Sequence, residues 1–127
     1  MTIVLEVMRI DLVTVDPSAT MREAAHAMFA GRAGSALVVR EGGLLGIFTE
    51  RDLMRALAFS YDHDLVRSSP VSLWMTEHPV TIRPDATVGR AVDVMLSRGF
   101  RHLPVMQGET LLGMVSMRDL AETIARE

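Results

Sequence analysis

Two short elements of this sequence place a glycine, a hydroxyl residue and a carboxylate at the same spacing. Residues 46–52 read GIFTERD and residues 113–119 read GMVSMRD. In each element Thr49 or Ser116 ends a predicted strand, and Asp52 or Asp119 follows three positions later in the first turn of a predicted helix. A helix N-terminus carries unpaired N–H groups and a partial positive charge, which suit a phosphate. The hydroxyl can bind that phosphate, and the carboxylate can accept both hydroxyls of a ribose.

A purely structural role fits the same residues. Thr49 and Ser116 are expected N-caps, and Asp52 and Asp119 each complete a capping box with the hydroxyl three residues before it. Capping and ligand binding are compatible, so the residues alone leave open whether a ligand binds. The glycine in each strand is interpreted as the point where a ligand approaches the backbone closely.

The two elements belong to a duplication that covers most of the chain. Residues 13–20 (VTVDPSAT) return as 80–87 (VTIRPDAT), and residues 44–53 (LLGIFTERDL) return as 111–120 (LLGMVSMRDL). The offset is 67 positions in both cases, so no gap separates the copies in alignment. A repeat this regular indicates two copies of one supersecondary unit, each burying its apolar face against the other.

Each copy predicts the order strand, helix, strand, strand, helix. Strands are expected at 13–15, 35–39 and 45–48, and again at 80–82, 103–106 and 112–115, with a glycine in each hairpin turn. Apolar residues with helical spacing predict one helix face from Met21 to Phe29 and its twin from Val88 to Leu96. Closing helices are expected at 51–58 and 118–126. The polar stretch 59–70 predicts a linker, followed by a short helical turn at 71–75, with a matching lead-in near residues 4–8.

Composition excludes several classes of protein. The 127 residues are 49% hydrophobic and 23% charged, which is typical of a folded globular domain. A net charge of −3 and 5% aromatic residues argue against nucleic-acid binding. No apolar run approaches the ~20 residues of a membrane span, and no signal peptide is evident. The absence of cysteine excludes disulfides and thiolate chemistry and fits a cytoplasmic protein.

No catalytic or metal-binding constellation emerges from the sequence. The four histidines lack a spacing that suggests a shared metal, and a polar linker explains Asp62, His63 and Asp64 better than chelation does. A Walker loop and a Gly-x-Ser-x-Gly element are both missing. We therefore expect a protein that is not an enzyme and that requires no metal.

The tandem units and their motifs resemble a pair of cystathionine β-synthase (CBS) domains. The resemblance rests on the two Gly-x-x-Thr/Ser-x-x-Asp elements, on the Met75-Thr76 lead-in and on residues 101–105 (RHLPV), and it extends from about Met8 to Ala125. It implies an α+β fold in which two β-α-β-β-α repeats, 8–58 and 75–125 with a linker at 59–74, pack about a pseudo-twofold axis into one compact module. It also implies a regulatory role, two clefts for adenosine ligands such as AMP, ADP, ATP or S-adenosylmethionine, and association of two modules into a homodimer.

The resemblance assigns residues to the first cleft. Thr49 is expected on the phosphate and Asp52 on the ribose, both from the first copy. The second copy is expected to supply the opposite wall, with Arg101 and His102 facing the phosphates and with Thr81 and Ile82 near the base.

The second cleft is the counterpart by symmetry. Ser116 and Asp119 are expected to hold the ligand there, faced by Gly34 and Ser35 together with Thr14 and Val15. Because Gly34 and Ser35 stand where the first cleft has Arg101 and His102, the first cleft is predicted to bind phosphate better. Arg51 and Arg118 are either further phosphate contacts or solvated arginines.

The sequence thus predicts a ligand-sensing regulatory module that binds an adenine nucleotide and transmits its occupancy through a dimer. The alternative is a structural association module, in which both Thr/Ser-x-x-Asp elements serve only as helix caps. The identity of the nucleotide, the presence of Mg²⁺ beside it and any effector protein, whether attached or separate, are left open by the residues.

Overall fold

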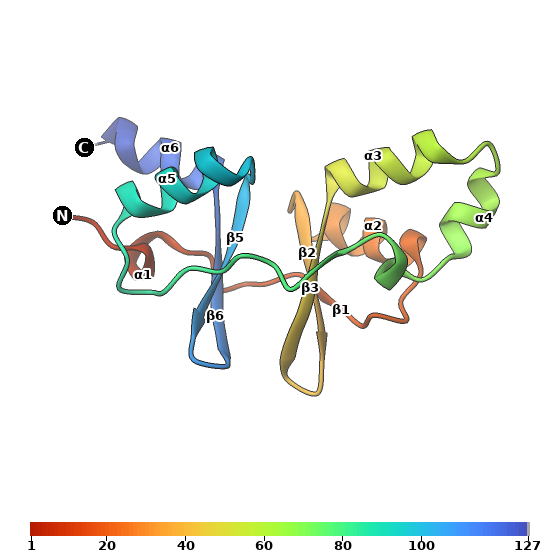
Figure 1. Cartoon of the computed structure of the whole chain (residues 1–127), viewed down its shortest axis with the longest axis horizontal. Coiled ribbons are helices and arrows are strands. Elements are labelled where there is room, and N and C mark those ends of the chain that lie inside the picture. The colour runs from red at the N-terminus through yellow and green to blue at the C-terminus, as the bar shows by residue number, and fades with distance from the viewer. Residues whose placement is uncertain (127) are drawn as a thin grey trace. The chain divides into compact units, whose positions relative to one another are not determined.

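The chain folds into two structural units, seen in a computed structural model that describes residues 1–126 (Figure 1). One unit is the continuous segment Val13–Pro79. The other joins Met1–Leu12 to the chain from Val80 onward. The first twelve residues therefore fold with the second repeat and not with their own.

The continuous unit contains a four-stranded sheet, three α-helices and one 3-10 helix. Its elements are β1 (Thr14–Val15), α2 (Met21–Ala30), β2 (Ser35–Arg40), β3 (Gly43–Thr49), α3 (Glu50–Phe59), α4 (His63–Ser68), the 3-10 helix η1 (Val71–Leu73) and β4 (Thr76–Glu77). The strand order is β1-β2-β3-β4; β1 runs parallel to β2 and the other neighbours are antiparallel. The β2–β3 turn has positive φ at Glu41 and Gly42, as the tight turn of a two-residue hairpin requires.

The second unit repeats this plan with fewer residues in regular strands. Its elements are α1 (Val4–Val7), α5 (Val88–Arg98), β5 (His102–Gln107), β6 (Thr110–Ser116) and α6 (Met117–Arg126). Single bridges replace the outer strands: Ile82 pairs in parallel with Val105, and Arg9 pairs antiparallel with Met114. Figure 1 shows α6 leaving directly from β6, as α3 leaves from β3.

Each repeat begins with a short segment, the lead-in, which spans about residues 3–9 in the first repeat and 70–77 in the second. The lead-in of each repeat completes the unit built around the other repeat. The Val4 N–H donates to the Ala86 carbonyl at 2.8 Å, and at the equivalent place the Val71 N–H donates to the Ala19 carbonyl at 2.7 Å. Isolated bridges join Ile3 to Thr87 and Thr20 to Pro70, which are again equivalent pairs. The exchange is therefore reciprocal, bond for bond.

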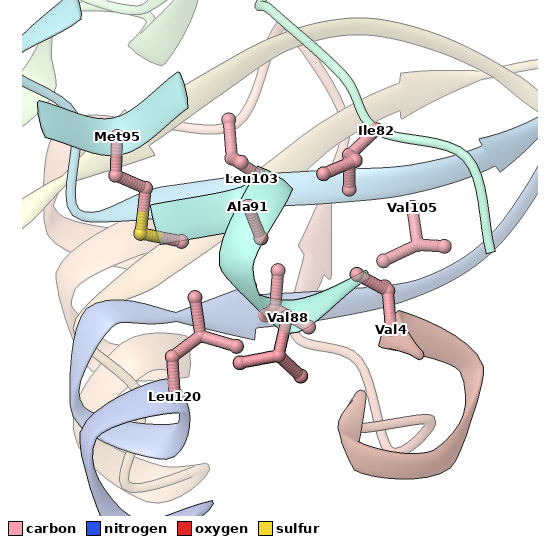
Figure 2. Packing of buried hydrophobic residues seen from close by; sticks show 9 residues of the cluster. Val4, Ile82, Val88, Ala91, Met95, Leu103, Val105 and Leu120 are labelled. Carbon is pink, nitrogen blue, oxygen red and sulfur yellow. The ribbon is translucent and has the colours of Figure 1, made fainter. Parts of the chain in front are cut away.

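The exchanged lead-ins also anchor the two cores. Val4 and Val71 occupy equivalent positions, and both are fully buried. Figure 2 shows Val4 of α1 among side chains of α5, β5 and α6, including Val88, Val105 and Leu120. Val71 packs in the other unit against a cluster that includes Phe48 and Met21. Fully burying such a side chain is worth about 1.5–3 kcal/mol, so each lead-in contributes substantially to the stability of its unit.

Most of the elements expected from the sequence are confirmed. The α+β class, the two repeats, all four hairpin strands and the helices of both copies are present. The α2 helix carries a capping box between Thr20 and Glu23, and α5 is capped by Thr87 without a reciprocal carboxylate.

Three expectations were wrong in detail. The strand expected at 80–82 is reduced to one bridge at Ile82. The stretch 59–70 is not simply a linker, because α4 forms there and buries Val66. Phe29 and its twin Leu96 are exposed, 84% and 70%. The buried face of α2 is formed by Met21, Ala24 and Met28, and α5 buries the equivalent face.

The packing of the two repeats about a pseudo-twofold axis stays a prediction. Within the described residues, no helix is both long and apolar enough to cross a lipid bilayer.

Gly46→Ala and Gly113→Ala are each expected to destabilise the protein by about 1–3 kcal/mol, because the new methyl group overpacks a backbone contact. A Cβ at Gly46 would lie 2.7 Å from the Thr76 carbonyl oxygen, and one at Gly113 would lie 2.7 Å from the Arg9 carbonyl oxygen. Gly89→Ala is the matched control, since its Cβ meets nothing closer than 3.9 Å and an alanine within α5 should stabilise by about 0.5–1 kcal/mol. Urea unfolding measures all three. Equal stability of Gly46→Ala and wild type would contradict the close approach.

Candidate functional site

Thr49 and Asp52 form a complete capping box where β3 passes into α3. The Thr49 N–H donates to Asp52 Oδ2 at 2.9 Å, and the Thr49 hydroxyl lies 3.1 Å from the same oxygen. The Asp52 N–H donates to Thr49 Oγ1 at 3.2 Å. Asp52 is only 5% exposed. The expected capping role is therefore confirmed, and it uses much of the acceptor capacity of this carboxylate.

Ser116 and Asp119 form a looser version of the same box where β6 passes into α6. The Asp119 N–H donates to Ser116 Oγ at 3.1 Å, and the Ser116 N–H reaches Asp119 Oδ2 at 3.4 Å. Asp119 is half-buried. The capping role is confirmed here too, but Asp119 is less enclosed than Asp52.

The first unit contains four further candidate residues and places two of them, Gly34 and Ser35, beside Thr49. Ser35 pairs with Thr49 across the β2–β3 ladder, and the Glu50 N–H donates to the Gly34 carbonyl at 3.1 Å. Thr14 and Val15 form β1 on the other side of β2. Beyond β1, the Arg40 guanidinium and then Ser18 hold the pKa of the Asp16 carboxyl well below its usual range.

The second unit repeats this arrangement with charged residues. His102 pairs with Ser116 across the β5–β6 ladder, and the Met117 N–H donates to the Arg101 carbonyl at 2.8 Å. Arg101 is exposed and His102 is half-buried. Thr81 is exposed beside Ile82, which bridges to β5.

Each unit therefore contains one full set of the candidate positions together with one of the two aspartates. The structure brings Arg101 and His102 to the strand end that carries Ser116. The assignment of Arg101 and His102 to the Thr49 and Asp52 cleft stays a prediction, and so does the reciprocal assignment to the second cleft. Arg51 and Arg118 are both exposed and remain candidates for phosphate contact.

The role expected for the two strand glycines was wrong. A Cβ on Gly46 would lie 2.6 Å from Met75 Sδ, and one on Gly113 would lie 2.7 Å from Met8 Sδ. The glycines thus admit the exchanged lead-in of the chain itself, and the space is not left for a ligand.

One residue beside the site was missed from the sequence. Arg55 Nη2 lies 3.3 Å from Asp52 Oδ1 and forms an ion pair one helical turn away. The equivalent residue in the second repeat is Glu122, of the opposite charge. The i, i+3 spacing of Asp52 and Arg55 was the available signal.

Metal binding receives no support from the described part of the chain. Among residues 1–126, no group of three or more histidine, aspartate or glutamate side chains is arranged to hold a metal ion.

Comparison with known proteins agrees with the repeat structure. The family model of the CBS domain matches the chain twice, over residues 4–59 and 66–126. The chain belongs to the CBS domain family. This CBS pair is 33% identical over 122 residues to the CBS domain-containing protein YhcV of Bacillus subtilis, covering 95% of this chain and 84% of that one. It is 40% identical over 112 residues to an uncharacterized 17.7 kDa protein of Acidianus ambivalens, covering 87% of this chain but 65% of the relative.

Solved structures share the fold over nearly the whole chain. A CBS-domain protein of Agrobacterium tumefaciens, ATU1752, matches with a TM-score of 0.90 and 32% identity, covering 97% of this chain and 99% of that one. CBSX2, solved in complex with AMP, matches with a TM-score of 0.83 and 20% identity, covering 99% of this chain and 98% of that one. The CBS pair of MJ0100, solved with 5′-methylthioadenosine and S-adenosyl-L-methionine, matches with a TM-score of 0.88 and 22% identity, with coverage of 99% and 98%. At these lower identities, the last two likenesses show the fold alone.

Thr49→Ala is expected to destabilise the protein by about 2 kcal/mol and Ser116→Ala by about 1 kcal/mol. Both lose an N-cap, but Thr49→Ala also leaves the buried Asp52 carboxylate short of a hydrogen bond from a hydroxyl. Chemical denaturation provides the measurement. Ser97→Ala is the control, because the Ser97 hydroxyl only donates to the Val94 carbonyl on the exposed side of α5. A larger loss in Ser116→Ala than in Thr49→Ala would contradict the difference between the two caps.

Proposed function

We propose that this CBS pair is a regulatory module that binds an adenosine-containing ligand and transmits its occupancy to an effector. The observation that carries the proposal is the pair of aspartates, Asp52 and Asp119, each held at the first turn of a helix behind a hydroxyl N-cap. Each aspartate can accept hydrogen bonds from a ribose, and the helix N-terminus at which it lies favours an anionic group nearby. Family membership supports regulation over catalysis.

The ligand class comes from the relatives. CBSX2 binds AMP, and the CBS pair of MJ0100 binds 5′-methylthioadenosine and S-adenosyl-L-methionine. The common part of these molecules is adenine joined to a ribose ring with free 2′- and 3′-hydroxyls, so the proposal is limited to that chemistry. Neither a cofactor nor a metal is needed, although Mg²⁺ can accompany a nucleotide with two or three phosphates. We also propose a cytoplasmic location, with which the lack of cysteine is consistent.

A structural association module is the second candidate function. It is favoured by the Asp52 carboxylate, which is buried and already engaged by Thr49 and Arg55. In that case both boxes would stabilise helices only, and no adenosine compound would bind.

A thermal-shift assay with adenosine, AMP, ADP, ATP, 5′-methylthioadenosine and S-adenosylmethionine separates the two functions. A ligand present at ~100 times its dissociation constant stabilises the folded protein by ~2.7 kcal/mol, a shift of several degrees for a domain of this size. Guanosine and GMP are the base controls. The shift should fall in the double variant Asp52→Asn/Asp119→Asn and persist in Asp93→Asn, which changes an exposed aspartate of α5 in the same way. An unchanged melting temperature with all six adenosine compounds would favour the association module.

Transmission through a dimer is the remaining part of the proposal. Large apolar side chains are exposed at equivalent places on α2 and α5, namely Phe29 and Leu96. We propose that these side chains are covered when two copies of the chain associate, because burial of exposed apolar surface favours association. Light scattering should therefore give about twice the chain mass of 14.0 kDa. Phe29→Ser/Leu96→Ser should lower this mass, and a monomeric wild type would contradict transmission through a dimer.

A further inference from the structure

The two ribose-binding candidates differ in how much of each carboxylate remains available. Asp52 Oδ2 accepts the N–H of Thr49 at 2.9 Å and lies 3.1 Å from its hydroxyl, so both lone-pair directions of this oxygen are engaged. Asp52 Oδ1 faces the Arg55 guanidinium at 3.3 Å. No oxygen of Asp52 is left without a partner.

Asp119 has the opposite character. Its Oδ2 accepts one long hydrogen bond, 3.4 Å from the Ser116 nitrogen. Among the described residues no ion pair reaches Asp119, because the position equivalent to Arg55 carries Glu122. Asp119 is also half-buried where Asp52 is buried, so its carboxylate is easier to reach.

A ribose donates two adjacent hydroxyls, and a carboxylate that holds both must offer two acceptor positions. Asp119 offers them. Asp52 offers them only if Arg55 moves away from Oδ1.

We propose that Arg55 closes the Asp52 carboxylate to a vicinal diol, so that Asp119 is the aspartate of this chain that accepts both hydroxyls of a ribose. This inference rests on the proposed function and adds to it the repeat whose aspartate binds the ribose. Arg55 acts through Asp52 and is a positioning residue. Its side chain is 58% exposed, and exposed ion pairs are weak, so the closure is a several-fold preference and not a block.

Equilibrium titration of adenosine and 2′-deoxyadenosine tests the inference without any phosphate to engage the arginines. In Asp52→Asn, where only Asp119 remains, loss of the 2′-hydroxyl should weaken binding about tenfold, since one charge-assisted hydrogen bond is lost. In Asp119→Asn, where only Asp52 remains, the same change should weaken binding threefold or less. Equal discrimination in the two variants would overturn the inference.

Substitutions at Arg55 and Glu122 test the cause while leaving both caps intact. Arg55→Gln, added to Asp119→Asn, should raise the discrimination against 2′-deoxyadenosine toward the tenfold value. The converse Glu122→Arg, added to Asp52→Asn, should reduce it. Arg67→Gln is the matched control, because it breaks another i, i+3 arginine–aspartate pair, with Asp64, on α4 of the same unit.

The outcomes separate this inference from the function on which it rests. If neither nucleoside nor AMP binds any of the proteins, the proposed function fails and the inference fails with it. If adenosine binds and Arg55→Gln leaves the discrimination unchanged, only the inference is overturned. Should an aspartate variant fail to fold, Arg55→Gln in the wild-type background is decisive by itself, with adenosine expected to bind one site about threefold more tightly and an unchanged affinity overturning the inference.

Discussion

The close approach of two backbones at Gly46 and Gly113 is the constraint on which the rest of the structure depends. At each glycine the lead-in lies where a side chain would otherwise be, with the carbonyl oxygen of Thr76 or Arg9 only 2.7 Å from the position that a Cβ would take. The lead-in then caps the loop before α2 or α5 and buries Val71 or Val4 in the core. Because each lead-in belongs in sequence to the other repeat, neither repeat completes its unit from its own residues. Duplication of the sequence alone does not imply this exchange of segments. The evidence for it is the reciprocal hydrogen bonds between each lead-in and the other repeat.

Beside the same glycines, the lead-ins pair with β3 and β6 close to the strand ends that carry the candidate site. Pairing with the lead-in holds Ile47 and Met114, two residues before the N-caps Thr49 and Ser116. The first turn of α3 or α6 then follows without any intervening loop. The aspartates are therefore positioned by the core of each unit and not by a flexible connection. Such rigidity favours a preorganised acceptor for a ligand, whose binding then costs less ordering entropy.

Much of this could be predicted from the sequence because it depends on local chemistry. The caps at Thr20, Thr49 and Ser116 follow from side chains three residues apart, and the hairpins follow from glycine turns between β-branched runs. The exchange of the lead-ins could not be predicted, since the offset of 67 residues relates each lead-in to its own repeat and says nothing of its packing partner. The glycine of each motif was evident in the sequence, but the group that packs against it is decided by tertiary contacts. The interpretation of Phe29 was wrong for a similar reason: the helical spacing of α2 admits it to the apolar face, while the tertiary packing of α2 leaves it 84% exposed.

The sequence repeat that predicts the fold also obscures one difference between the two halves, which is the residue beside each aspartate. Alignment of the repeats pairs Asp52 with Asp119 and predicts equal roles for them, and the most evident difference between the aligned sites is Arg101 against Gly34. The ability of a carboxylate to accept further hydrogen bonds, however, depends on the groups that its oxygens already contact. Arg55 and Glu122 lie outside the shared motif, yet they give the two aspartates opposite neighbours on the same face of equivalent helices. Under the proposal for Arg55, duplicated sites keep identical motifs and diverge through one residue a helical turn away, without loss of the cap that the fold requires.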